Sequence, residues 1–115
     1  MKAGSAAAVP DHDERPLMLT SNEYFDGNVK SIGFTTNEPG AESASVGVME
    51  PGEYTFTTGK AEEMSVISGK LRVLLPNTSA WQDFGPDAQF SVPGSSSFQV
   101  EVEVTTAYLC RYLNI

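Results

Sequence analysis

The chain has 115 residues, a formal net charge of −8 and a single cysteine. This length suits one domain with one core, and the negative charge argues against a nucleic-acid polymer as partner, because that affinity comes mainly from Lys and Arg side chains. The composition, 40% hydrophobic, includes no apolar run near the roughly 20 residues that span a membrane. Ala3 to Val9 is too short and too weakly apolar for a secretory signal, and Cys110 alone fits a reduced compartment, so we expect a soluble cytoplasmic protein.

Residues 1–17, MKAGSAAAVPDHDERPL, are rich in Ala, Pro and charge and show no periodicity. We expect a disordered N-terminal extension here, followed by one folded domain over residues 18–115. The only histidine, His12, lies in the extension. The folded domain is therefore expected to work without an imidazole base.

From Ser21 onward, short β-like segments alternate with Gly and Pro turns, and helical apolar spacing is almost absent. The predicted strands are Val29 to Phe34, Ala44 to Met49, Tyr54 to Thr58, Met64 to Ser68, Leu71 to Leu75, Gln89 to Val92, Ser97 to Val104 and Ala107 to Leu113. Regularly spaced short strands with such turns predict an all-β fold, a sandwich or small barrel.

Two segments, Gly52 to Gly69 and Asp87 to Phe98, resemble the paired motifs of a small metal cupin, a jelly-roll β-barrel. In that register the four ligand positions hold Phe56, Thr58, Glu62 and Phe98. Phenylalanine binds no metal and threonine is a poor neutral ligand, so we expect a single-domain cupin without a metal.

Strand parity predicts which side chains line the barrel, because alternate residues face opposite sides. In this register Tyr54, Phe56, Met64 and Phe98 form an apolar cavity, Thr58 shares a face with Tyr54 and Phe56, and Glu62 lies at the cavity mouth. A Glu-Glu dipeptide is more often a solvated turn. At a cavity mouth, however, Glu62 could accept hydrogen bonds from sugar hydroxyls or have its pKa raised for acid–base work.

The folded domain has few cations, and Arg111 is the one flanked by apolar neighbours, Leu109 and Leu113. A guanidinium in such surroundings must be paired, either with a framework glutamate or with a bound phosphate or carboxylate. The sequence leaves both readings open. Ser96 and Ser97, in the turn after Pro93-Gly94, could supplement an anion site or form a plain loop.

Strings distributed over the whole folded part resemble the small single-domain cupins known as pyrimidine/purine nucleoside phosphorylases. They are Ser21-Asn-Glu-Tyr-Phe25, Val29-Lys-Ser-Ile-Gly-Phe34, Ala44-Ser-Val-Gly-Val-Met49, Gly52-Glu-Tyr-Thr-Phe56, Glu62-Glu-Met-Ser-Val-Ile-Ser-Gly69, Val73-Leu-Leu-Pro76, Val92-Pro-Gly94 and Tyr108-Leu-Cys-Arg-Tyr-Leu113. The extension before Met18 departs from the compact start of the family.

The resemblance implies a broad-specificity phosphorolysis without metal or other cofactor. Inorganic phosphate, as co-substrate, would displace the base of purine and pyrimidine nucleosides to give free base and (deoxy)ribose 1-phosphate. It also implies a small dimer, which fits the apolar character of both faces of Tyr108 to Leu113. Within this reading we expect Arg111 to serve the phosphate and Glu62 the ribose. The alternatives are a non-enzymatic cupin that binds a small metabolite and a metal cupin with unusual ligands.

Overall fold

The computed structural model describes residues 19–37 and 42–113, so the predicted extension over 1–17, including His12, lies outside the described residues. The described part consists of strands and connections, and no helix in it is long and apolar enough to cross a membrane. The ten strands are β1 (Thr20–Tyr24), β2 (Val29–Thr35), β3 (Ser43–Met49), β4 (Gly52–Thr57), β5 (Glu62–Ser68), β6 (Leu71–Leu74), β7 (Gln82–Phe84), β8 (Gln89–Val92), β9 (Ser97–Val102) and β10 (Thr106–Tyr112).

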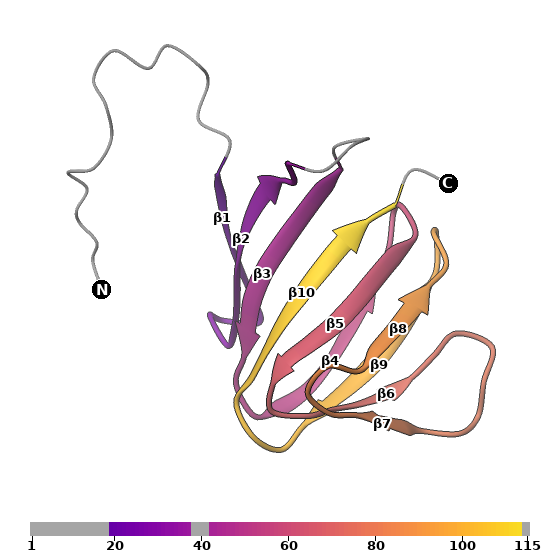
Figure 1. Ribbon diagram of the computed structural model, residues 1–115. Coiled ribbons are helices and arrows are strands. Elements are labelled where there is room, and N and C mark those ends of the chain that lie inside the picture. The colour runs from indigo at the N-terminus through magenta and orange to yellow at the C-terminus, as the bar shows by residue number, and fades with distance from the viewer. Residues whose placement is uncertain (1–18, 38–41, 114–115) are drawn as a thin grey trace, which may run out of the picture.

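The strands form two antiparallel sheets, one of six strands in the order β1-β2-β3-β10-β5-β8 and one of four in the order β4-β9-β6-β7. Figure 1 shows the six strands fanned across the view from β1 to β8, with the smaller sheet alongside the β5–β8 end. Non-sequential neighbours such as β3 and β10 bring the two ends of the chain together in one sheet. The all-β jelly-roll architecture predicted from the sequence is confirmed.

All eight predicted strands are present, with ends shifted by one or two residues in most of them. Two strands, β1 and β7, were not predicted, and each lies at one edge of its sheet. Most of their side chains are exposed, so neither carries the apolar alternation that marks a half-buried strand. One detail was wrong: Val104, predicted to continue the apolar face of β9, is 53% exposed because β9 ends at Val102.

The core between the sheets is aliphatic and aromatic. Its most completely buried members are Val29, Met49, Val66, Leu71, Val73, Val92 and Val100. They come from both sheets, as expected for a sandwich closed by alternating inward side chains. This core fixes the relative position of the strands that carry the cavity described below.

The middle of β2 and β3 has its polarity reversed, although Val29 and Met49 in the same strands are buried in the core. Inward positions on β2 and β3 hold Ser31, Ser45 and Gly47, whereas Ile32 and Val46 point outward and are 43% and 42% exposed. Ordinary alternation would bury the aliphatic set and expose the small polar set. The reversal gives the barrel interior a polar floor and leaves an apolar strip on the outside.

Candidate active site

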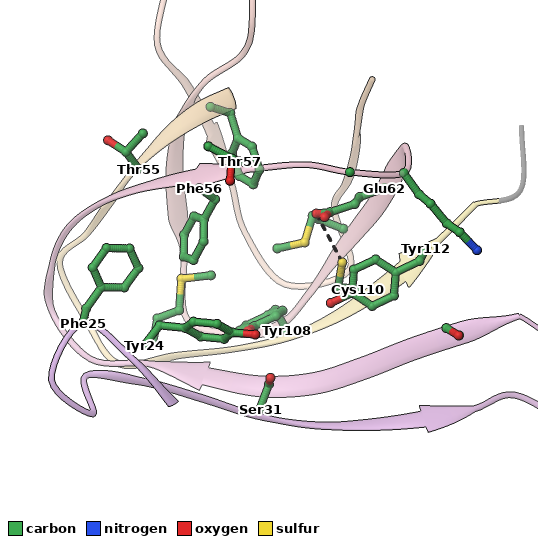
Figure 2. A pocket seen from close by; sticks show the side chains of 16 residues that line it. Tyr24, Phe25, Ser31, Thr55, Phe56, Thr57, Glu62, Tyr108, Cys110 and Tyr112 are labelled. Atoms are coloured by element: carbon green, nitrogen blue, oxygen red, sulfur yellow. Dashed lines mark hydrogen bonds between the residues drawn. The ribbon is translucent and has the colours of Figure 1, made fainter. Parts of the chain in front are cut away.

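A cavity of about 570 Å³ lies inside the barrel, over the inner face of the large sheet. One end is aromatic, with Tyr24, Phe25 and Phe56, and the other holds Glu62 among polar side chains (Figure 2). The volume is within the range of small-molecule sites, and a mainly apolar cavity with a few convergent polar groups is the usual form of such a site. The cavity is therefore the candidate active site.

Glu62 is the one carboxylate among the described residues that line the cavity. It begins β5 and stands opposite Tyr112 of β10, and the Cys110 thiol donates a hydrogen bond of 3.4 Å to its Oε1 (Figure 2). Burial raises the pKa of Glu62, and the bond from Cys110 lowers it by a smaller amount. Of the two interpretations of Glu62, a half-buried carboxylate in this position supports a role in acid–base or electrostatic catalysis over a residue of a solvated turn.

Three inward side chains of β10 form the wall next to Glu62: Tyr108, Cys110 and Tyr112. Burial is the main reason that the pKa of Tyr108 rises to about 12, and it also raises the pKa of Cys110 and of Tyr112. All three groups are therefore neutral near pH 7 and keep a proton to donate. The Tyr112 hydroxyl lies 3.1 Å from Ser45 Oγ on the neighbouring strand.

Gly47 makes room for one of these phenols. A Cβ at this position would lie 2.6 Å from the Tyr108 hydroxyl oxygen and 2.7 Å from the Lys30 carbonyl oxygen. Only glycine leaves room for the phenol so close to the backbone of β3. The glycine of the Val-Gly-Val sequence is thus explained by the shape of the cavity floor.

A tight turn fixes the segment that precedes Glu62. Thr58 Oγ1 donates to the Pro93 carbonyl oxygen at 2.7 Å and accepts from the Ser96 N–H at 3.0 Å, and the Ser95 N–H donates to the Gly59 carbonyl oxygen at 3.1 Å. These bonds anchor the segment that carries Lys60, which is among the residues that line the cavity. Among the described lining residues, Lys60 is the single cation.

Four of the nine residues predicted for the site line this cavity: Phe56, Glu62, Met64 and Phe98. The other five, Tyr54, Thr58, Ser96, Ser97 and Arg111, are not among the lining residues, so the prediction that Tyr54 helps to form this cavity is corrected. Tyr54 is buried behind the cavity wall, where its hydroxyl donates to the Glu50 carbonyl oxygen at 2.6 Å. Thr58 and Ser96 are hydrogen-bonded to each other, since the Ser96 N–H donates to Thr58 Oγ1. Ser97 is exposed on β9.

Arg111 lies on the face of β10 that points away from the cavity, because the inward positions are taken by Cys110 and Tyr112. Its guanidinium is 3.3 Å from Glu42 Oε1 in a partly buried ion pair. Of the two readings left open by the sequence, the structure shows the pair with a glutamate. It does not bring Arg111 together with Glu62.

Several cavity residues were not selected from the sequence. They are Tyr24 and Phe25, at and just after the end of β1, and Tyr108, Cys110 and Tyr112 of β10. The available signal was the alternation Tyr-x-Cys-x-Tyr in a strand next to the one that begins with Glu62. It could be used only once β10 was known to pair with β5.

The positions equivalent to cupin metal ligands do not fit a metal. Phe56 and Phe98 stack on each other with ring centroids 5.5 Å apart, and Thr58 is engaged with the Pro93–Ser96 turn. Within residues 19–37 and 42–113, no group of three or more His, Cys, Asp or Glu side chains could hold a metal ion. We derive no chemistry through a metal at this site.

The fold defines the chain as a cupin. It superposes on an RmlC-like cupin from Shewanella frigidimarina with a TM-score of 0.63, over 90% of each chain and at 14% identity, which is a likeness of fold alone. A family model described as pyrimidine/purine nucleoside phosphorylase matches residues 19–112. The chain belongs to this family.

Two proteins of higher identity also resemble this chain. A Yersinia pestis protein named pyrimidine/purine nucleoside phosphorylase is 56% identical over 97 residues, which is 84% of this chain and 100% of the relative. A crystal structure of a Vibrio parahaemolyticus protein of unknown function has a TM-score of 0.78 at 43% identity, over 84% of this chain and all of the other.

Proposed function

We propose that the protein is a nucleoside phosphorylase, a pentosyltransferase that uses inorganic phosphate to cleave purine and pyrimidine nucleosides into free base and (deoxy)ribose 1-phosphate. Membership of the family supports the reaction class. The observation that supports the site is a cavity in which one carboxylate, Glu62, is surrounded by neutral thiol and phenol donors and faces an aromatic end. Neither a metal nor another cofactor is part of the proposal.

In this reaction the bond between C1′ and the base nitrogen breaks, and its electron pair leaves with the base. A phosphate oxygen forms the new bond to C1′, and positive charge develops on the sugar between the two events. An ionised Glu62 beside the sugar would stabilise that charge more in the transition state than in the ground state. Neutral Tyr108 and Tyr112 would donate hydrogen bonds to ribose hydroxyls without adding negative charge.

For the phosphate we propose Lys60 in place of Arg111. Lys60 is among the residues that line the cavity, whereas Arg111 lies on the opposite face of β10, away from the cavity. A lysine ammonium attracts phosphate as a point charge, so it suits a small mobile co-substrate.

The reaction is tested by incubating the protein with uridine or inosine, with and without phosphate, and measuring free base. Base release that requires phosphate and yields ribose 1-phosphate supports the proposal. Binding of nucleoside with no base release in either condition would instead support the non-enzymatic metabolite-binding cupin, and release without phosphate would indicate hydrolysis.

The phosphate site is tested with two single variants, Lys60→Gln and Arg111→Lys. Loss of one charge-assisted contact corresponds to roughly 1.5 to 3 kcal/mol, so Lys60→Gln should raise the KM for phosphate by about ten- to a hundredfold. Arg111→Lys should leave this KM unchanged. An unchanged KM for phosphate in Lys60→Gln together with a raised KM in Arg111→Lys would instead assign the phosphate site to Arg111.

We also propose that two copies associate through the outer face of the large sheet. Ile32, Val46, Val48 and Ile67 are each 42–51% exposed there, and cross-strand register aligns Ile32, Val46 and Leu109 across β2, β3 and β10. An aliphatic strip of this kind on a small acidic protein is the common form of a subunit interface. A second copy suits it because the same strip on both partners makes a self-complementary two-fold contact.

The dimer is tested by light scattering at micromolar concentration. The wild-type protein should have the mass of a dimer, and Val46→Lys, which places a charge in the centre of the strip, should have the mass of a folded monomer. A monomeric wild type would contradict the proposal.

A further inference from the structure

The turn between β1 and β2 presents two adjacent aromatic side chains, Tyr24 and Phe25, to the same cavity (Figure 2). Consecutive side chains of an extended strand point to opposite faces, so this arrangement needs a change of backbone direction. Phe25 provides it with φ 55, and Asp26 and Gly27 follow with φ 58 and φ 86. The left-handed backbone at Phe25 thus accompanies the placement of the Phe25 ring on the same side of the sheet as Tyr24, facing the cavity.

A left-handed conformation is unfavourable for a bulky aromatic residue, and such strain persists only where the surroundings hold it. Here the Gly27 N–H donates to the Tyr24 carbonyl oxygen and the Asn28 N–H to the Phe25 carbonyl oxygen, each at 3.1 Å. The Phe25 ring also contacts Tyr54 at a centroid distance of 4.9 Å and Phe56 at 5.5 Å, the latter pair nearly perpendicular. The position of the ring is therefore fixed in advance of any ligand.

Core packing does not account for this arrangement. Despite their contacts, Tyr24 and Phe25 are 46% and 42% exposed at the cavity mouth. A strained backbone that holds two large aromatic rings partly in water is better explained by a ligand that covers them.

We propose that Tyr24 and Phe25, backed by Phe56, form the stacking surface for a planar heteroaromatic base. This inference rests on the proposed function, which assigns the end of the cavity around Glu62 to the sugar. Stacking uses the π face that every purine and pyrimidine has. Because these three side chains offer no amide or charged group to the edge of a base, the surface cannot strongly reject one base in favour of another.

The test measures binding of hypoxanthine and of uracil to the phosphate-free protein by calorimetry. Phe25→Leu keeps apolar bulk against Tyr54 but loses the planar ring, and Phe25→Tyr restores the ring. Val104→Ala serves as the control for loss of an exposed apolar side chain outside the cavity. Thermal unfolding of each variant verifies that it is folded, and Phe25→Gly, which suits the left-handed backbone, replaces Phe25→Leu if the latter does not fold.

We expect Phe25→Leu to weaken binding of both bases by about five- to a hundredfold, the range for loss of one base–aromatic stack, while Phe25→Tyr and Val104→Ala stay within about twofold of wild type. Base binding that is unaffected by the loss of the ring, or a folded wild type that binds neither base, would overturn the proposal. A wild type that binds bases through Phe25 but fails to phosphorolyse nucleosides would retain the stacking surface and discard the proposed reaction alone.

Discussion

Replacement of Glu62 by glutamine should produce a protein that is more stable at pH 8 and slower in catalysis. The substitution keeps the shape of the side chain and an oxygen that can accept the 3.4 Å bond from the Cys110 thiol, and it removes the negative charge. Since burial raises the pKa of Glu62, the charged form is what the folded protein disfavours. Removal of the Glu62 charge should therefore raise the stability of the fold and lower the rate of catalysis.

The stability effect has a defined pH dependence. A carboxyl with a raised pKa in the folded state destabilises the fold when it is ionised, by up to about 1.4 kcal/mol for each pKa unit, reduced here by solvent that reaches the half-buried group. This cost disappears as the pH falls through the folded-state pKa toward the ordinary glutamate value. The stability advantage of Glu62→Gln should thus be present at pH 8 and absent near pH 4, as measured by urea unfolding at both pH values.

The kinetic effect follows from the charge that develops on the sugar. Loss of a charge-assisted interaction corresponds to roughly 1.5 to 3 kcal/mol, which predicts a fall in kcat of about ten- to a hundredfold for uridine and inosine. The acid limb of the wild-type pH profile should lie above the usual range of glutamate and should be missing in Glu62→Gln. Glu63→Gln is the matched control, because Glu63 points to the other face of β5. A Glu62→Gln protein with wild-type kcat and lower stability at pH 8 would refute this account.

Two further outcomes follow from the site. Gly47→Ala, whose Cβ would lie 2.6 Å from the Tyr108 hydroxyl, should destabilise the fold by about 1–3 kcal/mol and reduce activity, whereas Gly85→Ala, with open space around it, should do neither in thermal unfolding and turnover assays. Extensive dialysis against EDTA should leave turnover unchanged, because the cupin ligand positions hold Phe56 and Phe98; loss of turnover that one divalent metal restores would contradict this.

Much of the cavity's apolar wall could be predicted from strand parity and the cupin register. Phe56, Met64 and Phe98 lie in strands with clear alternation, and Glu62 follows in the same register, so their shared interior position needed only local information. Alternation in the last strand separates Arg111 from Tyr108, Cys110 and Tyr112, but it does not say which of the two faces is inside. Both faces of that strand are largely apolar, and the choice depends on pairing with β5 and β3.

The all-β class follows from local periodicity and turn residues in the sequence, and the side chains at the metal-ligand positions follow from the resemblance of two segments to the cupin motifs. Which strands pair, and how the sheets close, determines that Ser31, Ser45 and Gly47 face inward while Ile32, Val46 and Val48 face outward, against the usual rule of burial. The tertiary structure also decided that Phe25 joins Tyr24 at the cavity mouth through a left-handed backbone. The physical reason is that the inside of a barrel is defined by which strands pair and how the sheets close, and no single strand carries that information.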